Sequence, residues 1–159
     1  MTIEQQKFLH LAVVKCIPYS EIEQELGISR KIFSPWWNEL KQERLELTKI
    51  RVIWKSKCPE LSYEDFSHWY QNADKKCFYC DLTEAEMQIL WEKVPALTKR
   101  TRGRVLEIDR VSPNKDYYDF TNLVFACYWC NNAKTDTFTG EEFKKVGRVF
   151  AEIWRERLK

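Results

Sequence analysis

Four of the cysteines in this sequence stand in two pairs with the same spacing. Cys77 and Cys80 form one CxxC motif in CFYC, and Cys127 and Cys130 form the other in CYWC. The short turn within each pair aims two sulfurs at one point, so two pairs can surround one zinc ion tetrahedrally. Two disulfides or two separate redox motifs are the alternatives, but no secretory signal favours an oxidising compartment. We therefore predict a structural zinc site.

Oxygen-bearing and basic side chains surround the second pair in a fixed order. The stretch LEIDRVSPNKDYYDFTNLVFACYWCNNAKTD has Asp109 at the end of an apolar strand and Asn122 before Leu123. Asn131 follows the second CxxC directly, and Lys134 lies three residues further on. Together with the first CxxC, this ordered set resembles the HNH endonucleases over roughly residues 75–140. Each short motif alone would be a weak signal, whereas the complete series is specific.

The resemblance implies a fold and a role for each of these residues. The fold would be the ββα-metal fold, pinned by a structural zinc on the four cysteines. Asp109 and Asn131 would supply oxygen ligands to a catalytic Mg²⁺ or Mn²⁺, which stabilises the leaving oxygen of a DNA phosphodiester. Asn122 would orient the loop backbone, and Lys134 would meet the phosphodiester backbone. The plainer alternatives are a salt bridge from Asp109 to Arg110 or Lys134, and helix capping by Asn131.

Arg110 departs from the family's pattern, in which that position is the histidine that deprotonates the attacking water. A guanidinium stays charged above about pH 12 and cannot accept that proton, but it can hold a phosphate with two hydrogen bonds. Loss of the base would cost about 10²–10⁴-fold in rate. A second metal-bound water, a partner protein, His68, Asp116 or Asp119 could replace it, and the sequence does not choose among them.

Positive charge is concentrated after the first 70 residues, which carry equal numbers of basic and acidic side chains. The net charge of +2 says little about partners by itself. A short loop, KRTRGR, is more informative because it holds four cations: Lys99, Arg100, Arg102 and Arg104. Such a loop is often only a solvated connection, but here it is expected to contact the backbone of DNA, with RNA as a second possibility.

The region 1–58 is predicted to be helical. Thr2 and Gln5 have the spacing of a capping box, and a later helix stops at Gly27. The helix–glycine–helix pattern resembles a helix-turn-helix, although Glu23 replaces the usual small residue and Pro35 falls inside the second helix. A helical bundle with a tight turn is the alternative. This region could recruit DNA or a protein partner.

The region 59–159 is predicted to hold the HNH-like domain and a C-terminal helix. Ser62 and Asp65 should cap a helix before the first cysteine pair, and TEAEMQILWEKVP indicates another helix that ends at Pro95. A strand is expected in RVLEI, residues 104–108. The tail is an amphipathic helix whose apolar side should belong to the core: Phe143, Val146, Phe150, Ile153 and Trp154.

The composition favours an α+β fold that is mostly helical. Charged residues make up 31% of the chain, and only four glycines are present. Because no apolar run approaches the ~20 residues of a membrane span and no leader opens the chain, we expect a soluble, cytoplasmic protein. Cys16 and Cys58 are expected to be buried thiols. Two functions stay open: an HNH endonuclease that cuts DNA, and a non-catalytic nucleic-acid-binding zinc module or adaptor.

Overall fold

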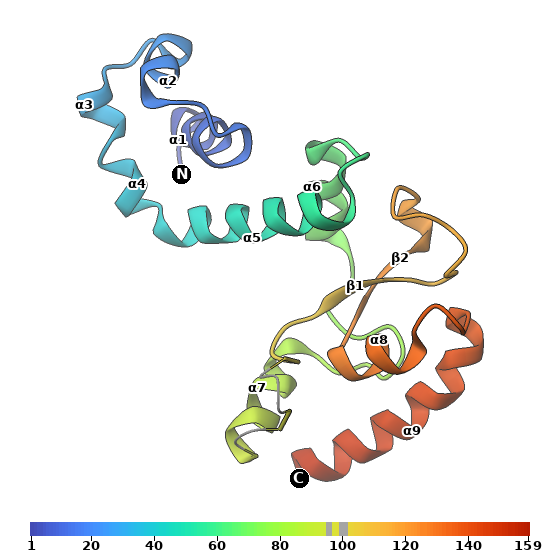
Figure 1. Ribbon diagram of the computed structural model, residues 1–159. Helices are drawn as coiled ribbons and strands as arrows, with labels where there is room; N and C mark the ends of the chain where they lie inside the picture. The colour runs from blue at the N-terminus through green and yellow to red at the C-terminus, as the bar shows by residue number, and fades with distance from the viewer. Residues whose placement is uncertain (95–96, 99–101) are drawn as a thin grey trace. The chain divides into compact units, whose positions relative to one another are not determined.

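The computed structural model describes residues 1–94, 97–98 and 102–159, which group into two compact units. By their contacts the units are Met1–Ser67 and His68–Lys159, so the division falls inside α6 (Tyr63–Asn72). The domain boundary predicted near residue 58, between the regions 1–58 and 59–159, stays a prediction. Helices dominate both units and a β-hairpin lies in the second (Figure 1), which confirms the predicted α+β, mostly helical fold. None of the helices in the described ranges has the length and hydrophobicity needed to cross a bilayer.

Helices build the first unit around one apolar cluster. Its elements are α1 (Ile3–Leu9), the π-helical turn η1 (His10–Lys15), α2 (Tyr19–Leu26), α3 (Arg30–Phe33), α4 (Trp36–Glu39) and α5 (Lys41–Lys57). The cluster gathers aromatic and aliphatic side chains from these helices and from the junction of α4 and α5: Phe8, Leu9, Leu11, Val13, Ile22, Phe33 and Leu40. The capping box of Thr2 and Gln5 forms as predicted, so the amide groups that start α1 are satisfied.

The π-helical turn explains why the prediction for Cys16 was wrong. Leu11, Val13 and Val14 are all buried, and the wider turn of a π-helix rotates this run toward the core. The turn then ends at Cys16, which takes a left-handed backbone conformation with φ of 56° and leaves its thiol exposed. Cys58 is buried as predicted, and this burial raises the pKa of its thiol to about 11.

The helices after η1 form a helix-turn-helix arrangement whose second helix is broken. Gly27 ends α2 in the left-handed region with φ of 65°, and Ser29 caps α3. Pro35 then separates α3 from α4. The carboxylate of Glu23 accepts a hydrogen bond from the backbone N–H of Arg30 at 2.9 Å, so a negative charge occupies the start of the second helix. Arg30 and Lys31 begin this helix as well, so both the helix-turn-helix and the helical-bundle interpretations of this region stay predictions.

The second unit places a two-stranded hairpin among helices. After α6 come α7 (Glu84–Lys93), β1 (Glu107–Arg110), the 3₁₀ turn η2 (Phe120–Asn122), β2 (Leu123–Ala126), α8 (Tyr128–Lys134) and α9 (Gly140–Leu158). The strands are antiparallel, and Asp109 lies opposite Val124. Because the chain passes from β2 through Cys127 directly into α8, the order strand, strand, helix of the predicted ββα module is present.

The segment before β1 is held by α7, so the strand begins at Glu107 and not at Arg104 as predicted. The indole N–H of Trp91 donates to the carbonyl of Gly103 at 3.0 Å, and Gln88 donates to the carbonyl of Arg104 at 2.7 Å. The amide of Leu106 donates to the carboxylate of Glu84 at 2.8 Å. These backbone groups therefore bond to side chains of α7 and not to a neighbouring strand.

The C-terminal helix α9 packs through only part of the predicted face, since Phe143 and Trp154 are buried as predicted. Val146 and Ile153 are 44% and 37% exposed, which contradicts the prediction that they belong to the core. The buried face consists of Gly140, Phe143, Gly147, Ala151 and Trp154. Small residues define this face because α9 approaches the backbone of the first CxxC loop very closely. A Cβ atom at Gly147 would overlap the carbonyl oxygen of Tyr79 and lie 2.8 Å from its carbonyl carbon.

Gly147→Ala is therefore expected to destabilise the second unit. Alanine favours a helix interior over glycine by about 1 kcal/mol, but overpacking against backbone costs roughly 1–3 kcal/mol, so the clash should win. Urea unfolding of the zinc-loaded protein measures the difference. Val149→Ala, at an exposed position of α9, is the control and should change stability little. A Gly147→Ala variant that is more stable than wild type would show that α9 can move away from Tyr79.

Candidate functional site

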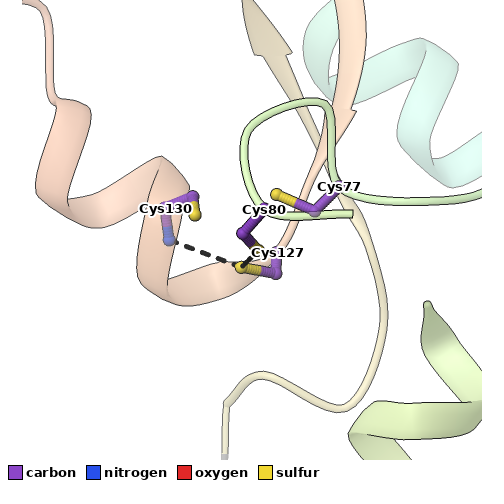
Figure 2. A group of neighbouring side chains, drawn as sticks. All are labelled: Cys77, Cys80, Cys127 and Cys130. Carbon is purple, nitrogen blue, oxygen red and sulfur yellow. Dashed lines mark hydrogen bonds between the residues drawn. The ribbon is translucent and has the colours of Figure 1, made fainter. Parts of the chain in front are cut away.

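The two cysteine pairs converge on one buried point. The sulfurs of Cys77, Cys80, Cys127 and Cys130 all lie within 4.8 Å of one another, and none forms a disulfide. Figure 2 shows the first pair on a loop and the second pair at the start of α8. The sulfurs of Cys80 and Cys127 are 3.7 Å apart, close to the ~3.8 Å edge of a tetrahedron with Zn–S bonds of about 2.3 Å. The cluster fits a structural zinc and contradicts the disulfide alternative.

Backbone hydrogen bonds shape the loop of the first pair and attach it to the hairpin. The amide of Asp81 donates to the carbonyl of Cys77 at 2.8 Å, which closes the turn. The amide of Phe78 donates to the carbonyl of Phe125 in β2, also at 2.8 Å. In the second pair, Cys127 caps α8, and its sulfur accepts from the amide of Cys130. The four sulfurs therefore join the loop, β2 and α8.

The thiols of the cluster shift one another's pKa values in opposite directions. Hydrogen bonds from Cys127, Cys130 and Cys80 lower the pKa of Cys77, so one thiolate is stabilised by its neighbours. Contacts with Cys127, Cys77 and Cys80 raise the pKa of Cys130, because a second negative charge beside the first is unfavourable. A divalent cation removes this conflict, since it stabilises several buried thiolates at once.

Four polar side chains of β1 and α8 face one another beside this cluster. Glu107 and Asp109 lie two residues apart on the strand and so share a face, while Asn131 and Lys134 lie three apart on the helix. The amide nitrogen of Asn131 donates to Glu107 Oε2 at 2.7 Å. The ammonium of Lys134 lies 3.4 Å from Asp109 Oδ2. The predicted ligands Asp109 and Asn131 thus sit on two elements that pack together.

Asp109 is buried, with 7% of its surface exposed, and Oδ2 of its carboxylate has two partners. The hydroxyl of Tyr79 donates to Oδ2 at 2.6 Å, and Lys134 provides the positive charge. Burial and this contact with Asp109 raise the pKa of Tyr79 well above its usual range, so its hydroxyl stays a donor. Of the two alternatives for Asp109, the salt bridge to Lys134 forms.

Lys134 is buried, and its position differs from the phosphate contact expected of it. Only 1% of the side chain is exposed, and Nζ also donates to the carbonyl of Arg110 at 2.8 Å. A phosphate outside the protein would have to extract this ammonium from both partners. In this position Lys134 forms an ion pair with Asp109 and holds its carboxylate in place.

Asn122 ties the loop after β1 to the start of β2. Its side-chain oxygen accepts from the amide of Ser112 at 2.7 Å, and its nitrogen donates to the carbonyl of Ser112 at 3.1 Å. Because the side chain is buried, these bonds satisfy both ends of its amide.

Arg110 is held in place at the end of β1. One guanidinium nitrogen lies 2.8 Å from the carboxylate of Asp136, and another donates to the carbonyl of Lys115 at 3.3 Å. The guanidinium also lies over the ring of Tyr117, 4.8 Å from its centroid. These contacts fix a positive charge one residue beyond Asp109.

The basic loop is described from Arg102 onward, while Lys99 and Arg100 lie outside the described residues. Arg102 is exposed and forms an ion pair of 2.9 Å with Glu107. Arg104 is also exposed, and its guanidinium lies over the ring of Trp91 at 4.1 Å. Arg102 is therefore anchored at the hairpin and Arg104 at α7, and both cations keep solvent access.

The groups considered as a replacement base have local partners of their own. His68 is exposed on α6, and its ring Nδ1 lies 3.4 Å from the side-chain nitrogen of Asn72. Asp116 accepts from the hydroxyl of Tyr118 at 2.7 Å. Asp119 caps η2, and its hydrogen bonds with Thr121 lower the pKa of its carboxyl. None of these contacts joins the groups to Asp109.

Sequence reasoning missed Tyr79 and Glu107, which hold the two predicted ligands. Tyr79 stands inside the first CxxC motif, where the pattern directs attention to the flanking cysteines. Glu107 could have been found, because the two-residue period of a strand puts it on the same face as Asp109. On α8, the three-residue spacing of Asn131 and Lys134 likewise indicates that the two side chains share a face of the helix.

Comparison with known proteins gives one structural similarity. No protein-family model matches the chain, and no curated protein matches it. A solved structure of the rare-cutting HNH restriction endonuclease PacI is similar with a TM-score of 0.50 and 22% identity, covering 76% of this chain and 78% of that one. At this identity the similarity concerns the fold. The fold of the chain therefore resembles that of an HNH restriction endonuclease.

Proposed function

We propose that the protein is a divalent-metal-dependent endonuclease of HNH type that hydrolyses phosphodiester bonds in DNA. The observation that carries the proposal is the meeting of β1 and α8 next to the four-cysteine cluster. There a buried carboxylate, Asp109, and an amide, Asn131, lie on packed elements whose fold resembles a DNA-cutting enzyme. The zinc would pin the module, since four thiolates leave no open position for substrate.

Asp109 and Asn131 fit a hard cation by their chemistry. A carboxylate and an amide oxygen are ligands that Mg²⁺ and Mn²⁺ accept, with water completing the octahedron. In the described part of the chain the side-chain oxygen of Asn131 accepts no hydrogen bond, whereas its nitrogen is held by Glu107. When bound, such an ion stabilises the leaving oxygen and the charge on the phosphate. Tyr79 and Lys134 both contact Oδ2 of Asp109 and hold its carboxylate in one orientation for this role.

Arg110 binds and offsets the charge of the scissile phosphate in this proposal. Its guanidinium cannot take a proton from water, but its fork of N–H groups suits a phosphate. Arg110 would give up its ion pair with Asp136 for the phosphate at little cost, because Asp136 is 84% exposed and such surface pairs are weak. Arg102 and Arg104 bind neighbouring phosphates, so affinity for DNA should fall as salt rises.

A non-catalytic DNA-binding module is the second candidate, and two observations favour it. Arg110 stands where the family has its base, and the ammonium of Lys134 already neutralises Asp109. In this alternative the zinc frame and the cations Arg102, Arg104 and Arg110 hold DNA without cutting it. For both candidate functions, the helices of the first unit would recruit a protein partner.

A plasmid-nicking assay separates the two candidates. The zinc-loaded protein is incubated with supercoiled DNA and Mg²⁺ or Mn²⁺, and Asp109→Ala and Asn131→Ala are expected to lose nicking by roughly 10²-fold or more. Asn132→Ala is the matched control, because Asn132 is the next residue of α8 but is exposed, and its side chain donates to the carbonyl of Tyr128 in its own helix. It should nick like wild type.

Binding and zinc content are measured on the same variants. All three should keep their zinc, and their affinity for uncut DNA without added Mg²⁺ or Mn²⁺ should stay close to that of wild type. DNA binding without nicking by wild type in either metal would contradict the endonuclease and support the binding module. Equal nicking by wild type and both ligand variants would show that the metal lies elsewhere.

A further inference from the structure

Glu107 connects a predicted metal ligand to the basic loop. One oxygen of its carboxylate, Oε2, accepts from the side-chain nitrogen of Asn131 at 2.7 Å. The other, Oε1, accepts from the guanidinium of Arg102 at 2.9 Å. Glu107 is about one-fifth exposed, at 22%, so this chain of contacts runs from the surface to the face between β1 and α8.

The chemistry of Glu107 decides how the Asn131 amide is turned. An asparagine side chain can present its NH₂ or its C=O by rotating about one bond, and only the C=O can bind a cation. An ionised carboxylate is purely an acceptor, so it binds the NH₂ and repels the C=O. Asn131 therefore keeps its nitrogen toward Glu107 and its oxygen available. A charge-assisted hydrogen bond of this kind is stronger than a neutral one.

Arg102 fixes Glu107 in turn. Its ion pair keeps the carboxylate at the hairpin, and the guanidinium also lies over the ring of Tyr128 on α8, 5.1 Å from its centroid. The backbone next to Arg102 is anchored as well, because Gly103 bonds to Trp91. Gly103 has a φ of 94°, which favours glycine. It also packs against Trp129, because a Cβ atom at this position would lie 3.2 Å from the Trp129 ring.

We propose that Glu107 is a positioning residue that presents the oxygen of Asn131 to the catalytic cation, and that Arg102 of the basic loop holds Glu107 for this task. This inference rests on the proposed function, since it concerns the ligand set of that site. It gives the basic loop a second role besides binding phosphates. Groups that support metal ligands in this way typically contribute about 10- to 100-fold in metal affinity.

Mn²⁺ binding to the zinc-loaded protein, followed by electron paramagnetic resonance, tests the proposal without DNA cleavage. Glu107→Ala should weaken Mn²⁺ binding by about 10-fold or more. Glu107→Gln lacks the charge but keeps an oxygen that can accept from Asn131, so it should bind Mn²⁺ more tightly than Glu107→Ala. Equal losses in the two variants would mean that Glu107 acts through its charge alone, which overturns the proposal.

Arg102→Ala tests whether the Mn²⁺ affinity rises or falls when Arg102 is removed. Removing a positive charge near the site should strengthen cation binding if only electrostatics mattered. The proposal requires the opposite, a weaker Mn²⁺ affinity, because Glu107 loses its support. Arg104→Ala is the matched control, since it removes the same charge from the same loop but contacts Trp91 and not Glu107. Tighter Mn²⁺ binding by Arg102→Ala would overturn the role of Arg102.

The side-chain amide signals of Asn131 in ¹⁵N NMR give a readout that needs no catalytic metal. They are assigned by their loss in Asn131→Asp, and in wild type they should show slow exchange with water that becomes fast in Glu107→Ala. Unchanged exchange would overturn the inference, even if Asp109→Ala abolishes Mn²⁺ binding and so supports the metal site. If the exchange responds to Glu107 but wild type binds no Mn²⁺ at Asp109, the proposed function fails and the positioning contact stands.

Discussion

Removing zinc is expected to unfold the second unit, His68–Lys159, while the first unit keeps its helices. The four sulfurs join the CxxC loop, β2 and α8. Gly147 of α9 also packs directly against the backbone of this loop at Tyr79. Structural zinc sites contribute about 10–16 kcal/mol of binding free energy at neutral pH. That is comparable with or larger than the roughly 5–15 kcal/mol net stability of a whole domain. The unit should therefore not stay folded without the ion.

The measurement is tryptophan fluorescence and near-UV circular dichroism during titration with a strong chelator. Wild type should contain about one zinc per chain, as four ligands imply, and should lose the signals of the second unit as zinc leaves. Acid should act in the same direction: protons compete with zinc for the thiolates, so the stability that zinc provides is lost as pH falls. Cys127→Ser should behave like the chelated protein.

Cys16→Ser is the control for the cysteine change, because Cys16 is exposed and lies in the first unit. It should keep both the zinc content and the unfolding curve of wild type. A zinc-free second unit with native circular dichroism would show that side-chain packing alone maintains the fold, and that the cluster has no structural role.

The parts of the fold that depend on local chemistry could be predicted from sequence. The capping boxes at Thr2 and Thr83 and the cap at Ser62 form as their spacing indicates. In the same way, the two CxxC turns bring their sulfurs together, because each turn fixes the geometry of its own pair. These signals need no knowledge of the rest of the chain.

The parts that depend on packing could not be predicted in this way. The exposure of Cys16 follows from a π-helical turn that the run Leu11 to Val14 adopts to bury three of its side chains. The buried face of α9 follows from the contact of Gly147 with the backbone of Tyr79, which periodicity alone does not reveal. In both places a tertiary contact overrides the local pattern.

In the candidate site, too, some residues could be predicted from the sequence, whereas their packing partners could not. The order of motifs led to Asp109, Asn122 and Asn131, which lie at the hairpin and on α8 as the resemblance implies. Their partners could not be assigned, because Tyr79 and Glu107 act through contacts between distant segments. The burial of Lys134 was equally hidden, since a lysine on a short helix is usually solvated.

Lys134→Met is expected to cost about 3–5 kcal/mol of stability, the range for breaking a buried ion pair from one side. Lys134 is 1% exposed and Asp109 is 7% exposed, so water can compensate the remaining carboxylate only in small part. Tyr79 still donates to it, but a neutral hydroxyl does not replace a positive charge. The carbonyl of Arg110 also loses its donor. Methionine keeps most of the volume, so a cavity contributes little.

A double-mutant cycle with Asp109→Asn isolates the pair. Asp109→Asn alone leaves the buried ammonium unpaired, whereas the double variant removes both charges together. The double variant should therefore be more stable than the sum of the single losses predicts, by about 0.5–3 kcal/mol. Urea unfolding of the zinc-loaded proteins measures all four corners of the cycle. Lys145→Met, an exposed lysine of α9, is the control and should change stability by about 0.5 kcal/mol or less.

The same pair governs how strongly a cation can compete for Asp109. Lys134 and a divalent metal ion both draw on this carboxylate, so the ammonium weakens metal binding by charge while it preserves the shape of the site. Lys134→Met should consequently bind Mn²⁺ more tightly at temperatures where it is folded, even though it unfolds at lower urea. Strictly additive stabilities in the cycle, with unchanged Mn²⁺ affinity, would mean that Lys134 and Asp109 do not interact, and the proposed support of the metal ligand would be wrong.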